Sequence, residues 1–280
     1  MQAQDIINNF TVILEKLFKS VENQVFEVLD EIILIGPDIL KSEPLKYIFF
    51  ENKVNGLIII ANSFLLFFFI YYVLSNLISM YNGKNIPNMY SFIIRILLVA
   101  ILVNCSYFIC NQILEIFELF SESVEMFTKE ICKQEINFVN LKEAIISLED
   151  FMQSDVLSLD GIMKGVLSFG ALSILIQFSI RYVTIIFLLM ISPFAFVSLM
   201  SDLTQEFFKT WMKLFVTNLL VQVVVKLLIL IPLLYKHTNH TMYKIILVGS
   251  IYLIYKTNQF VKELFAKFSS DVQSFDIFRS

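Results

Sequence analysis

The sequence predicts an all-α, polytopic membrane protein with about five membrane-spanning helices and amphipathic helices at the N-terminus, in the largest loop and at the C-terminus. Hydrophobic residues make up 57% of the 280 residues and charged residues only 16%, and the mean hydropathy is +0.74. Several apolar runs approach the roughly 20 residues that a helix needs to cross a bilayer. A water-soluble domain of this length does not need so much apolar surface, so a bilayer is the expected solvent.

Residues 1–55 form the first expected segment, an amphipathic one outside the hydrocarbon. It begins MQAQDIINNF, without the basic start of a secretory signal peptide. Apolar residues then recur at helical spacing from Ile6 to Ile32, with acids on the other face, which is typical of a helix lying on a membrane or on a partner. The residues GPD at 36–38 end this helix, because Gly and Pro interrupt helices.

Residues 56–114 contain the first two expected spans. No charged residue occurs in 54–83, so 56–80 can cross a bilayer with some tilt. The second span is expected over 92–114, with Arg95 close enough to its start to reach the headgroups. Three asparagines within these spans are expected to form hydrogen bonds between helices: Asn62, Asn76 and Asn104.

Residues 115–164 form the largest internal loop, expected on the extracytoplasmic side. The loop carries 11 acids against 4 lysines, which makes it too polar to enter lipid. The spacing of its Leu, Ile, Phe and Val residues predicts one or two amphipathic helices.

The last three expected spans lie within residues 165–257: 167–191, 214–235 and 243–255. As one straight helix, the apolar stretch 165–201 would be roughly 55 Å long, whereas the hydrocarbon core is about 30 Å thick. We therefore expect one helix to cross and the remainder to bend, with Pro193 as the kink. Trp211 is expected to anchor the start of the next span at the membrane interface.

Residues 258–280 are expected to form a basic amphipathic helix on the cytoplasmic membrane surface. Residues 1–160 hold 10 bases and 20 acids, whereas residues 161–280 hold 11 bases and 5 acids. We expect the N-terminus outside and the C-terminus inside the cell membrane, because short inside segments then hold a high density of bases and the long acidic segments lie outside. These bases are Lys84, Arg95, Lys209, Lys213 and those of the tail. Abundant Phe, Ile, Asn and Lys indicate an AT-rich coding sequence and hence a low-GC bacterium.

Two cations lie deep in expected spans, Arg181 in the third and Lys226 in the fourth. Polar residues accompany them at helical steps of three or four: Ser173, Gln177, Arg181 and Thr184 on one helix, and Asn218, Gln222 and Lys226 on the next. No Asp or Glu lies in any expected span, so an ion pair within the chain is not expected.

A charged side chain at mid-membrane is costly and usually faces a bundle interior, a hydrated cavity or a partner. Compensation could come from water, lipid phosphate, an acid of another subunit or an anionic substrate. Snorkelling of both cations toward the interface is the alternative. The candidates for a substrate path or a subunit contact are Arg181, Lys226, Gln177, Gln222 and Asn218.

No metal site, cofactor or catalytic site is expected. His237 and His240 share one loop but lack the further ligands that a metal ion needs. The three cysteines, Cys105, Cys110 and Cys132, do not form a disulfide framework. No nucleophile stands at useful spacing from a base, and no GxxxxGK[ST] phosphate loop occurs. The sequence therefore predicts a protein that is not an enzyme.

The order of spans and loops over residues 56–255 resembles the TrbL-like polytopic inner-membrane subunits of type IV secretion and conjugation systems. The local resemblance lies in RYVTIIFLLMISPFAF at 181–196 and EFFKTWMKLFVTNLLVQ at 206–222. It implies an oligomeric channel or scaffold subunit of the cell membrane. That subunit would work with other membrane subunits and cytoplasmic ATPases to move single-stranded DNA or protein. A permease subunit of an exporter or of a small-solute transporter is the alternative.

Overall fold

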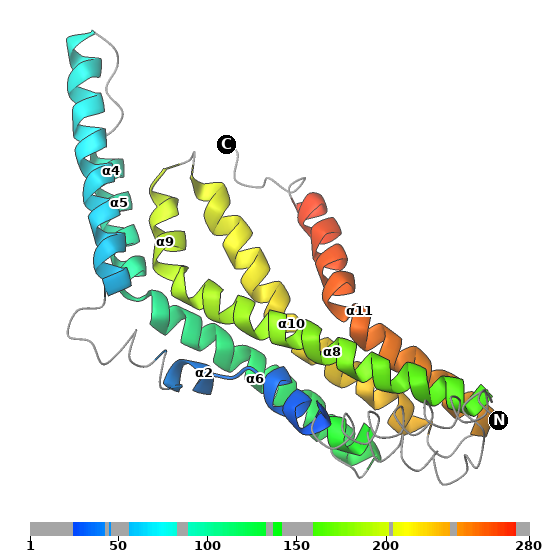
Figure 1. The fold of residues 1–280 in the computed structure, drawn as a ribbon. Coiled ribbons are helices and arrows are strands. Elements are labelled where there is room, and N and C mark those ends of the chain that lie inside the picture. The colour runs from blue at the N-terminus through cyan, green and yellow to red at the C-terminus, as the bar shows by residue number, and fades with distance from the viewer. Residues whose placement is uncertain are drawn as a thin grey trace, which may run out of the picture. The chain divides into compact units, whose positions relative to one another are not determined.

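The computed structural model is all-α, as predicted. It describes residues 25–42, 45, 56–82, 89–132, 137–141, 159–201, 204–235 and 240–272. The helices are α2 (Asp38–Lys41), α4 (Gly56–Tyr81), α5 (Met89–Asn104), α6 (Ser106–Cys132), α8 (Leu159–Met190), α9 (Ser192–Val197), the 3-10 helix η2 (Ser198–Met200), α10 (Gln205–Leu234) and α11 (His240–Val272) (Figure 1).

Residues 25–33 and 138–141 are also helical. Several expectations concern residues outside the described ones. These are the start of the N-terminal segment, most of the loop after residue 141, His237 and the end of the C-terminal tail.

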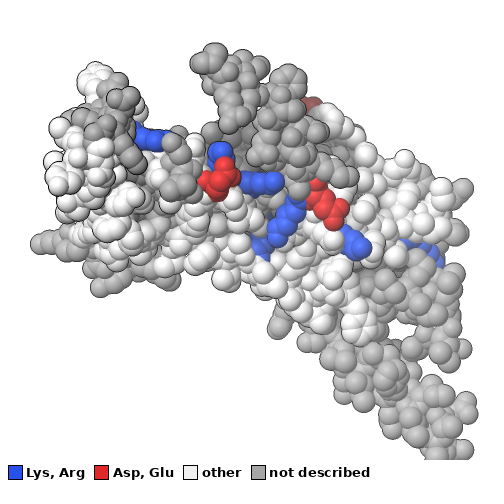
Figure 2. All heavy atoms as spheres, turned by 90° about the horizontal axis from the view of Figure 1, so that it is seen from above, with Lys and Arg blue, Asp and Glu red and all other residues white. Residues whose placement is uncertain are grey.

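Three described helices are long and apolar enough to cross a membrane, which indicates a multi-pass membrane protein. The crossing stretches are Gly56–Tyr81, Phe169–Met190 and Gln205–Leu234. A fourth candidate combines Tyr90–Asn104 with Ser106–Cys132, two helices that meet at an angle of 62°. Figure 2 shows that charged side chains occupy only a small part of the described surface on the face drawn, as expected where lipid is the neighbour.

The expected second span, 92–114, is not one straight helix. It is divided at Cys105 into α5 and α6. The side-chain amide of Asn104 donates to the carbonyl of Ala100 at 2.8 Å, and a polar side chain that bonds back to its own helix favours a bend. The same amide pairs with Asn62 of α4, at 3.3 and 3.4 Å in the two directions. The predicted bond between helices is confirmed for this pair and stays a prediction for Asn76.

The expected fifth span, 243–255, lies within α11, which is not among the candidate crossing helices. Lys244 and Lys256 limit its apolar stretch to residues 245–255. This stretch is shorter than the roughly 20 residues that the hydrocarbon core requires. The number of candidate spans in the described part of the chain is therefore three or four, against the five expected.

The chain folds as two compact units, of which unit 1 contains Met1–Ile35, Phe117–Tyr182 and Thr217–Ser280. The apolar core of unit 1 joins residues 25–33 to α8, α10 and α11 (Figure 1). Its buried members include Val25, Phe26, Leu29, Ile33, Ala171, Ile174, Phe178, Val221, Val225, Ile229, Leu247, Ile251 and Ile254. Residues 25–33 are thus part of the packed core of this unit, and the described residues 25–35 are called the N-terminal segment below.

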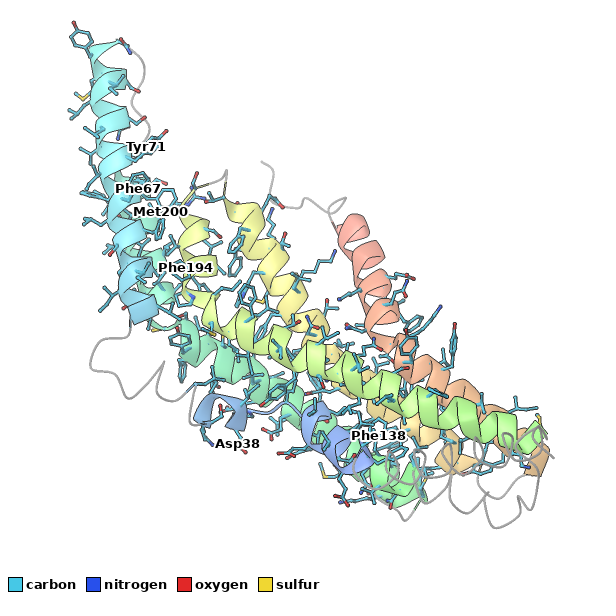
Figure 3. The ribbon with its side chains drawn as sticks, in the orientation of Figure 1. Asp38, Phe67, Tyr71, Phe138, Phe194 and Met200 are labelled. Atoms are coloured by element: carbon cyan, nitrogen blue, oxygen red, sulfur yellow. The ribbon has the colours of Figure 1, made fainter. Side chains whose placement is uncertain are left out.

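Unit 2 contains Gly36–Ile116 and Val183–Val216. Here α4, α5 and α9 pack against one another, and Phe194 lies on α9 (Figure 3). Its ring meets that of Phe64 on α4 edge to face, at 6.1 Å between ring centroids. Most of α4 is exposed, with Ile58, Ala61 and Leu65 as its buried residues. An apolar helix with this exposure fits a lipid environment.

A close approach of α8 and α11 in unit 1 provides a test of the packing. A Cβ atom added at Gly170 would lie 2.7 Å from Cγ2 of Ile251, whereas one added at Gly249 would meet nothing within 4 Å. We expect Gly170→Ala to lower the free energy of unfolding by about 1–3 kcal/mol through overpacking. Gly249→Ala should raise it by up to about 1 kcal/mol, since Ala favours a helix. Thermal unfolding of the detergent-solubilised protein measures both, and equal effects would contradict the close packing.

Candidate functional site

Arg181 of α8 is buried in unit 1, with 1% of its surface exposed. Its Nε donates to the carbonyl of Asn218 at 2.7 Å and its Nη1 donates to the carbonyl of Ile33 at 3.3 Å. Nη2 donates to Oε1 of Gln222 at 3.4 Å, and the guanidinium lies 5.9 Å from the ring centroid of Phe178. Three neutral oxygens on two segments, α10 and residues 25–35, therefore solvate this cation, because the planar fork of Arg can reach several acceptors at once.

Gln222 of α10 links the N-terminal segment to two helices. Its Oε1 accepts from the backbone N–H of Ile35 at 3.2 Å as well as from Arg181. Its Nε2 donates to the carbonyl of Phe117 on α6 at 3.3 Å. A single side chain 1% exposed thus satisfies groups of the N-terminal segment, α6 and α8.

Lys226 lies one helical turn after Gln222 and is 4% exposed. Its Nζ donates to the carbonyl of Ser121 at 3.3 Å and to Oε2 of Glu125 at 3.1 Å. Glu125 also pairs through Oε1 with Lys129 at 3.2 Å. The prediction that no ion pair within the chain compensates these cations is therefore wrong for Lys226. The acid lies on α6, which continues as a helix through residues assigned to a polar loop.

We call these groups the buried polar network: the side chains of Arg181, Gln222, Lys226 and Glu125 with the backbone groups of Ile33, Ile35, Phe117, Ser121 and Asn218. All of them belong to unit 1. A buried charge or amide without partners costs several kcal/mol, whereas one with partners fixes the register of the helices that carry it. The network can therefore hold the N-terminal segment, α6, α8 and α10 in one arrangement.

Asp30 supports the network from the N-terminal segment. Its carboxylate accepts the backbone N–H groups of Phe138 and Val139, at 2.6 and 3.1 Å. Burial raises the pKa of the Asp30 carboxyl above its ordinary value, against the opposing effect of these two bonds. Asp30 therefore clamps the short helix 138–141 onto residues 25–33, beside the buried ring of Phe138 (Figure 3).

A pocket of about 230 Å³ lies between these segments. It is lined by Asp30, Ile33, Leu34, Glu125, Asn137, Phe138, Lys226 and Ile229. Its charged groups already have protein partners, since Lys226 bonds Glu125 and Asp30 caps the helix 138–141. This pocket is therefore an edge of the network rather than a separate catalytic site.

The remaining predicted site residues lie in different surroundings. Asn218 contributes its backbone carbonyl to Arg181, and its side chain is buried. Gln177 is not a partner of Arg181 in any bond described above; its Oε1 is buried without a hydrogen-bond partner. The hydroxyl of Ser173 donates to the carbonyl of Phe169 on its own helix. Of the polar stripe on α8, Arg181 therefore joins the buried polar network, whereas the side chains of Ser173 and Gln177 do not.

Pro193 and Trp211 both belong to unit 2. α8 ends at Met190, and Pro193 lies in the first turn of α9, where a helix tolerates proline. Trp211 is 2% exposed. Its indole N–H donates to the carbonyl of Leu188 at 2.9 Å, and its ring stacks on Phe215. This is the environment of a core residue joining α8 to α10, and the role as an interface anchor stays a prediction.

Sequence reasoning missed the acid and the carbonyls that compensate the two cations. Backbone carbonyls carry no sequence signal, so those of Ile33 and Ser121 could not be identified. A signal for Glu125 existed, because it lies on an amphipathic helical pattern that continues from the second expected span. Assigning that pattern to an external loop removed Glu125 from consideration.

Groups of at least three His, Cys, Asp or Glu residues that could hold a metal ion are absent from the described part of the chain. Cys105, Cys110 and Cys132 are free thiols. The buried polar network contains one carboxylate, one lysine and one arginine, and within the described residues it lacks an arrangement of nucleophile and base.

A family model described as conjugal transfer protein TrbL matches residues 3–274. The chain belongs to this TrbL family. No curated protein and no solved structure matches it significantly. The resemblance inferred from the order of spans is therefore confirmed, and it extends well beyond residues 56–255. In this TrbL family chain, the matched region includes every residue of the buried polar network.

A double-mutant cycle can measure the coupling between Lys226 and Glu125. We expect Glu125→Ala to lower the free energy of unfolding by about 3–5 kcal/mol, because it leaves the Lys226 ammonium buried without a carboxylate. Lys226→Met should cost less, since Glu125 keeps Lys129 as a partner. The double variant should be more stable than the sum of the two losses predicts. Additive losses in a denaturant titration would show that the ion pair contributes no coupling.

Proposed function

We propose that this chain is a non-enzymatic membrane subunit of a conjugative DNA-transfer machine, which holds a fixed bundle of helices beside the substrate path. The observation that carries the proposal is the family match over residues 3–274. Three long apolar helices support a location in the cell membrane. In this role the chain works as an oligomer with other membrane subunits. Separate cytoplasmic ATPases supply energy for moving single-stranded DNA or protein.

The buried polar network defines the chain's part in this role. Arg181 and Lys226 are 1% and 4% exposed, and oxygens of the same unit surround both. A cation in this state cannot contact a passing polyanion unless those bonds break. We therefore assign Arg181, Lys226, Gln222 and Asn218 the task of locking helices. The substrate path then forms between subunits, at surfaces whose position the locked helices determine.

The arrangement in the membrane is a further part of the proposal. The N-terminus and the loop that follows α6 lie outside, and the segment 258–280 lies inside. This topology requires five crossings, so the bent pair α5–α6 and α11 must cross in addition to the three candidate helices. The short apolar stretch of α11 then needs a locally thinned bilayer or neighbouring subunits.

Reporter fusions test this topology. A phosphatase that is active only outside the cytoplasm, fused after residue 280, should be inactive, because Lys and Arg near the C-terminus favour the cytoplasmic side. The same phosphatase inserted in the acidic loop at residue 150 should be active. An active C-terminal fusion would contradict five crossings with an external N-terminus.

Substitution of the two cations tests their function. We expect Arg181→Leu with Lys226→Leu to abolish conjugal transfer while leaving membrane insertion intact, because Gln222 and Glu125 each lose one of their two donors and the helices loosen. Lys213→Leu on the same helix is the matched control and should transfer normally. Transfer frequency, membrane fractionation and protease resistance are measured together.

The charge-conserving variant Arg181→Lys separates helix locking from a direct contact with cargo. A single ammonium cannot reproduce the fork that bonds three oxygens, so locking predicts reduced transfer and reduced protease resistance. If Arg181 instead lines the substrate path, Arg181→Lys should show normal transfer and normal protease resistance. Transfer at the normal rate by the double leucine variant would remove the assigned role altogether.

A further inference from the structure

A second pocket of unit 1 lies between α8 and α11, the helices that approach closely at Gly170 and Ile251 (Figure 1). It has a volume of about 330 Å³, and we call it the α8–α11 pocket. None of its lining residues belongs to the buried polar network. These residues are Ser173, Ile176, Gln177, Ile180, Tyr255, Lys256 and Gln259.

The α8 side of the pocket lies inside the bilayer. The crossing stretch of α8 is Phe169–Met190, and the residues of this helix that line the pocket lie within 173–180. At 1.5 Å per residue, they lie roughly 6 to 17 Å beyond Phe169 along the helix axis, in a hydrocarbon core about 30 Å thick. The pocket therefore extends from near one edge of the hydrocarbon to its centre.

The α11 side of the pocket lies at the same depth, because the two helices run side by side in the same direction. Ile251 lies beside Gly170, and further along both helices residues 255–259 share the pocket with residues 173–180. Lys256 and Gln259 are therefore polar residues at a depth where lipid tails surround the protein. Their polarity also explains why α11 is not among the candidate crossing helices.

Polar and apolar side chains occupy different exposed faces of α11 beyond residue 255. Lys256, Gln259 and Glu263 follow one another at helical steps of three and four, whereas Phe260 and Leu264 form a neighbouring strip. All five are exposed. The apolar strip suits lipid tails. The polar strip does not, because a charged side chain that faces lipid at this depth is costly.

The pocket has the polarity and the volume to hold water against this polar strip. None of its lining residues is an acid, so the lining offers the ammonium of Lys256 no carboxylate. Nζ of Lys256 lies 5.3 Å from the ring centroid of Tyr252, which is 55% exposed. The hydroxyl of Ser173 and the amide of Gln259 provide further partners for water, and the volume is sufficient for several water molecules.

We propose that the α8–α11 pocket is a water-filled groove inside the bilayer that attracts small anions. Water enters through a local thinning of the bilayer and hydrates the polar strip of α11, while the apolar strip faces lipid. The ammonium of Lys256 makes the electrostatic potential of the groove positive, which raises the local concentration of anions. This property belongs to the chain by itself and does not depend on the transfer function proposed above.

One acid limits the extent of the positive region. Glu263 lies outside the lining, one helical turn beyond Gln259, and its carboxylate accepts from the Gln259 amide at 3.1 Å. Gln259 therefore lies between a cation and an anion on the same face of α11. A probe at this position can report the effect of each charge separately.

Cysteine accessibility tests whether the groove is hydrated. Each of two groove residues has a neighbour in sequence at nearly the same depth that is exposed but outside the pocket: Phe260 next to Gln259, and Leu172 next to Ser173. The full chain with a cysteine at one of these four positions is reconstituted in liposomes and treated on both faces with 2-sulfonatoethyl methanethiosulfonate. Peptide mass spectrometry identifies the labelled residue, so the three native cysteines remain in place.

We expect Gln259→Cys and Ser173→Cys to react at least about tenfold faster than Phe260→Cys and Leu172→Cys, because the reactive thiolate is suppressed in apolar surroundings. Equally slow reaction at all four positions would show that lipid or another subunit covers the pocket. Equally fast reaction at all four would show that this part of unit 1 lies in water. Either result would overturn the proposal.

Two reagents of opposite charge test the attraction of anions. At Gln259→Cys, the rate of the anionic reagent is divided by that of the cationic 2-(trimethylammonium)ethyl methanethiosulfonate. Adding Lys256→Gln should lower this ratio several-fold, because loss of a positive charge one turn away slows the anion and speeds the cation. Adding Glu263→Gln should raise it. A ratio that Lys256→Gln leaves unchanged, or that both variants shift in the same direction, would overturn the attraction of anions.

Discussion

The burial of two cations among apolar helices is the constraint on which unit 1 depends. Neither Arg181 nor Lys226 can remain charged away from water unless oxygens replace its hydration shell. The chain provides them from the N-terminal segment, α6 and α10, in the form of backbone carbonyls, one amide and one carboxylate. Each oxygen is useful only when its own segment is in place, so the two cations make the positions of these segments interdependent.

This interdependence explains why the N-terminal segment belongs to the core. Apolar contacts of Val25, Phe26, Leu29 and Ile33 hold it there, each contributing about 1.5–3 kcal/mol where water is the alternative. The hydrogen bonds of the Ile33 carbonyl and the Ile35 N–H then fix the orientation of this segment, because hydrogen bonds are directional and apolar contacts are not. Asp30 fixes the position of the helix 138–141 in the same way, by accepting the backbone N–H of Phe138. In a membrane, where apolar contacts distinguish poorly between partners, such polar bonds select one arrangement of helices.

For a subunit of a transfer machine, a fixed arrangement of helices is a function in itself. Within unit 2, most of α4 is an exposed apolar surface, as a helix surrounded by lipid requires. The hydrogen bonds of the network hold its charged groups inside unit 1, which in the proposed function separates them from both lipid and cargo. In the proposed function, work on the cargo belongs to partner proteins.

Composition and periodicity by themselves determined the fold class, the three candidate spans, the family resemblance and the two cations that need compensation, because these properties depend on residue type and spacing along one helix. Which atoms compensate the cations was decided only by the tertiary structure, since Ile33, Asn218 and Ser121 act through carbonyls that every residue possesses. The break at Cys105 and the pairing of Glu125 with Lys226 were likewise decided by contacts between helices far apart in sequence. A hydropathy pattern records how apolar a stretch is but not which neighbour it meets, and the neighbour determines whether a buried charge is stable.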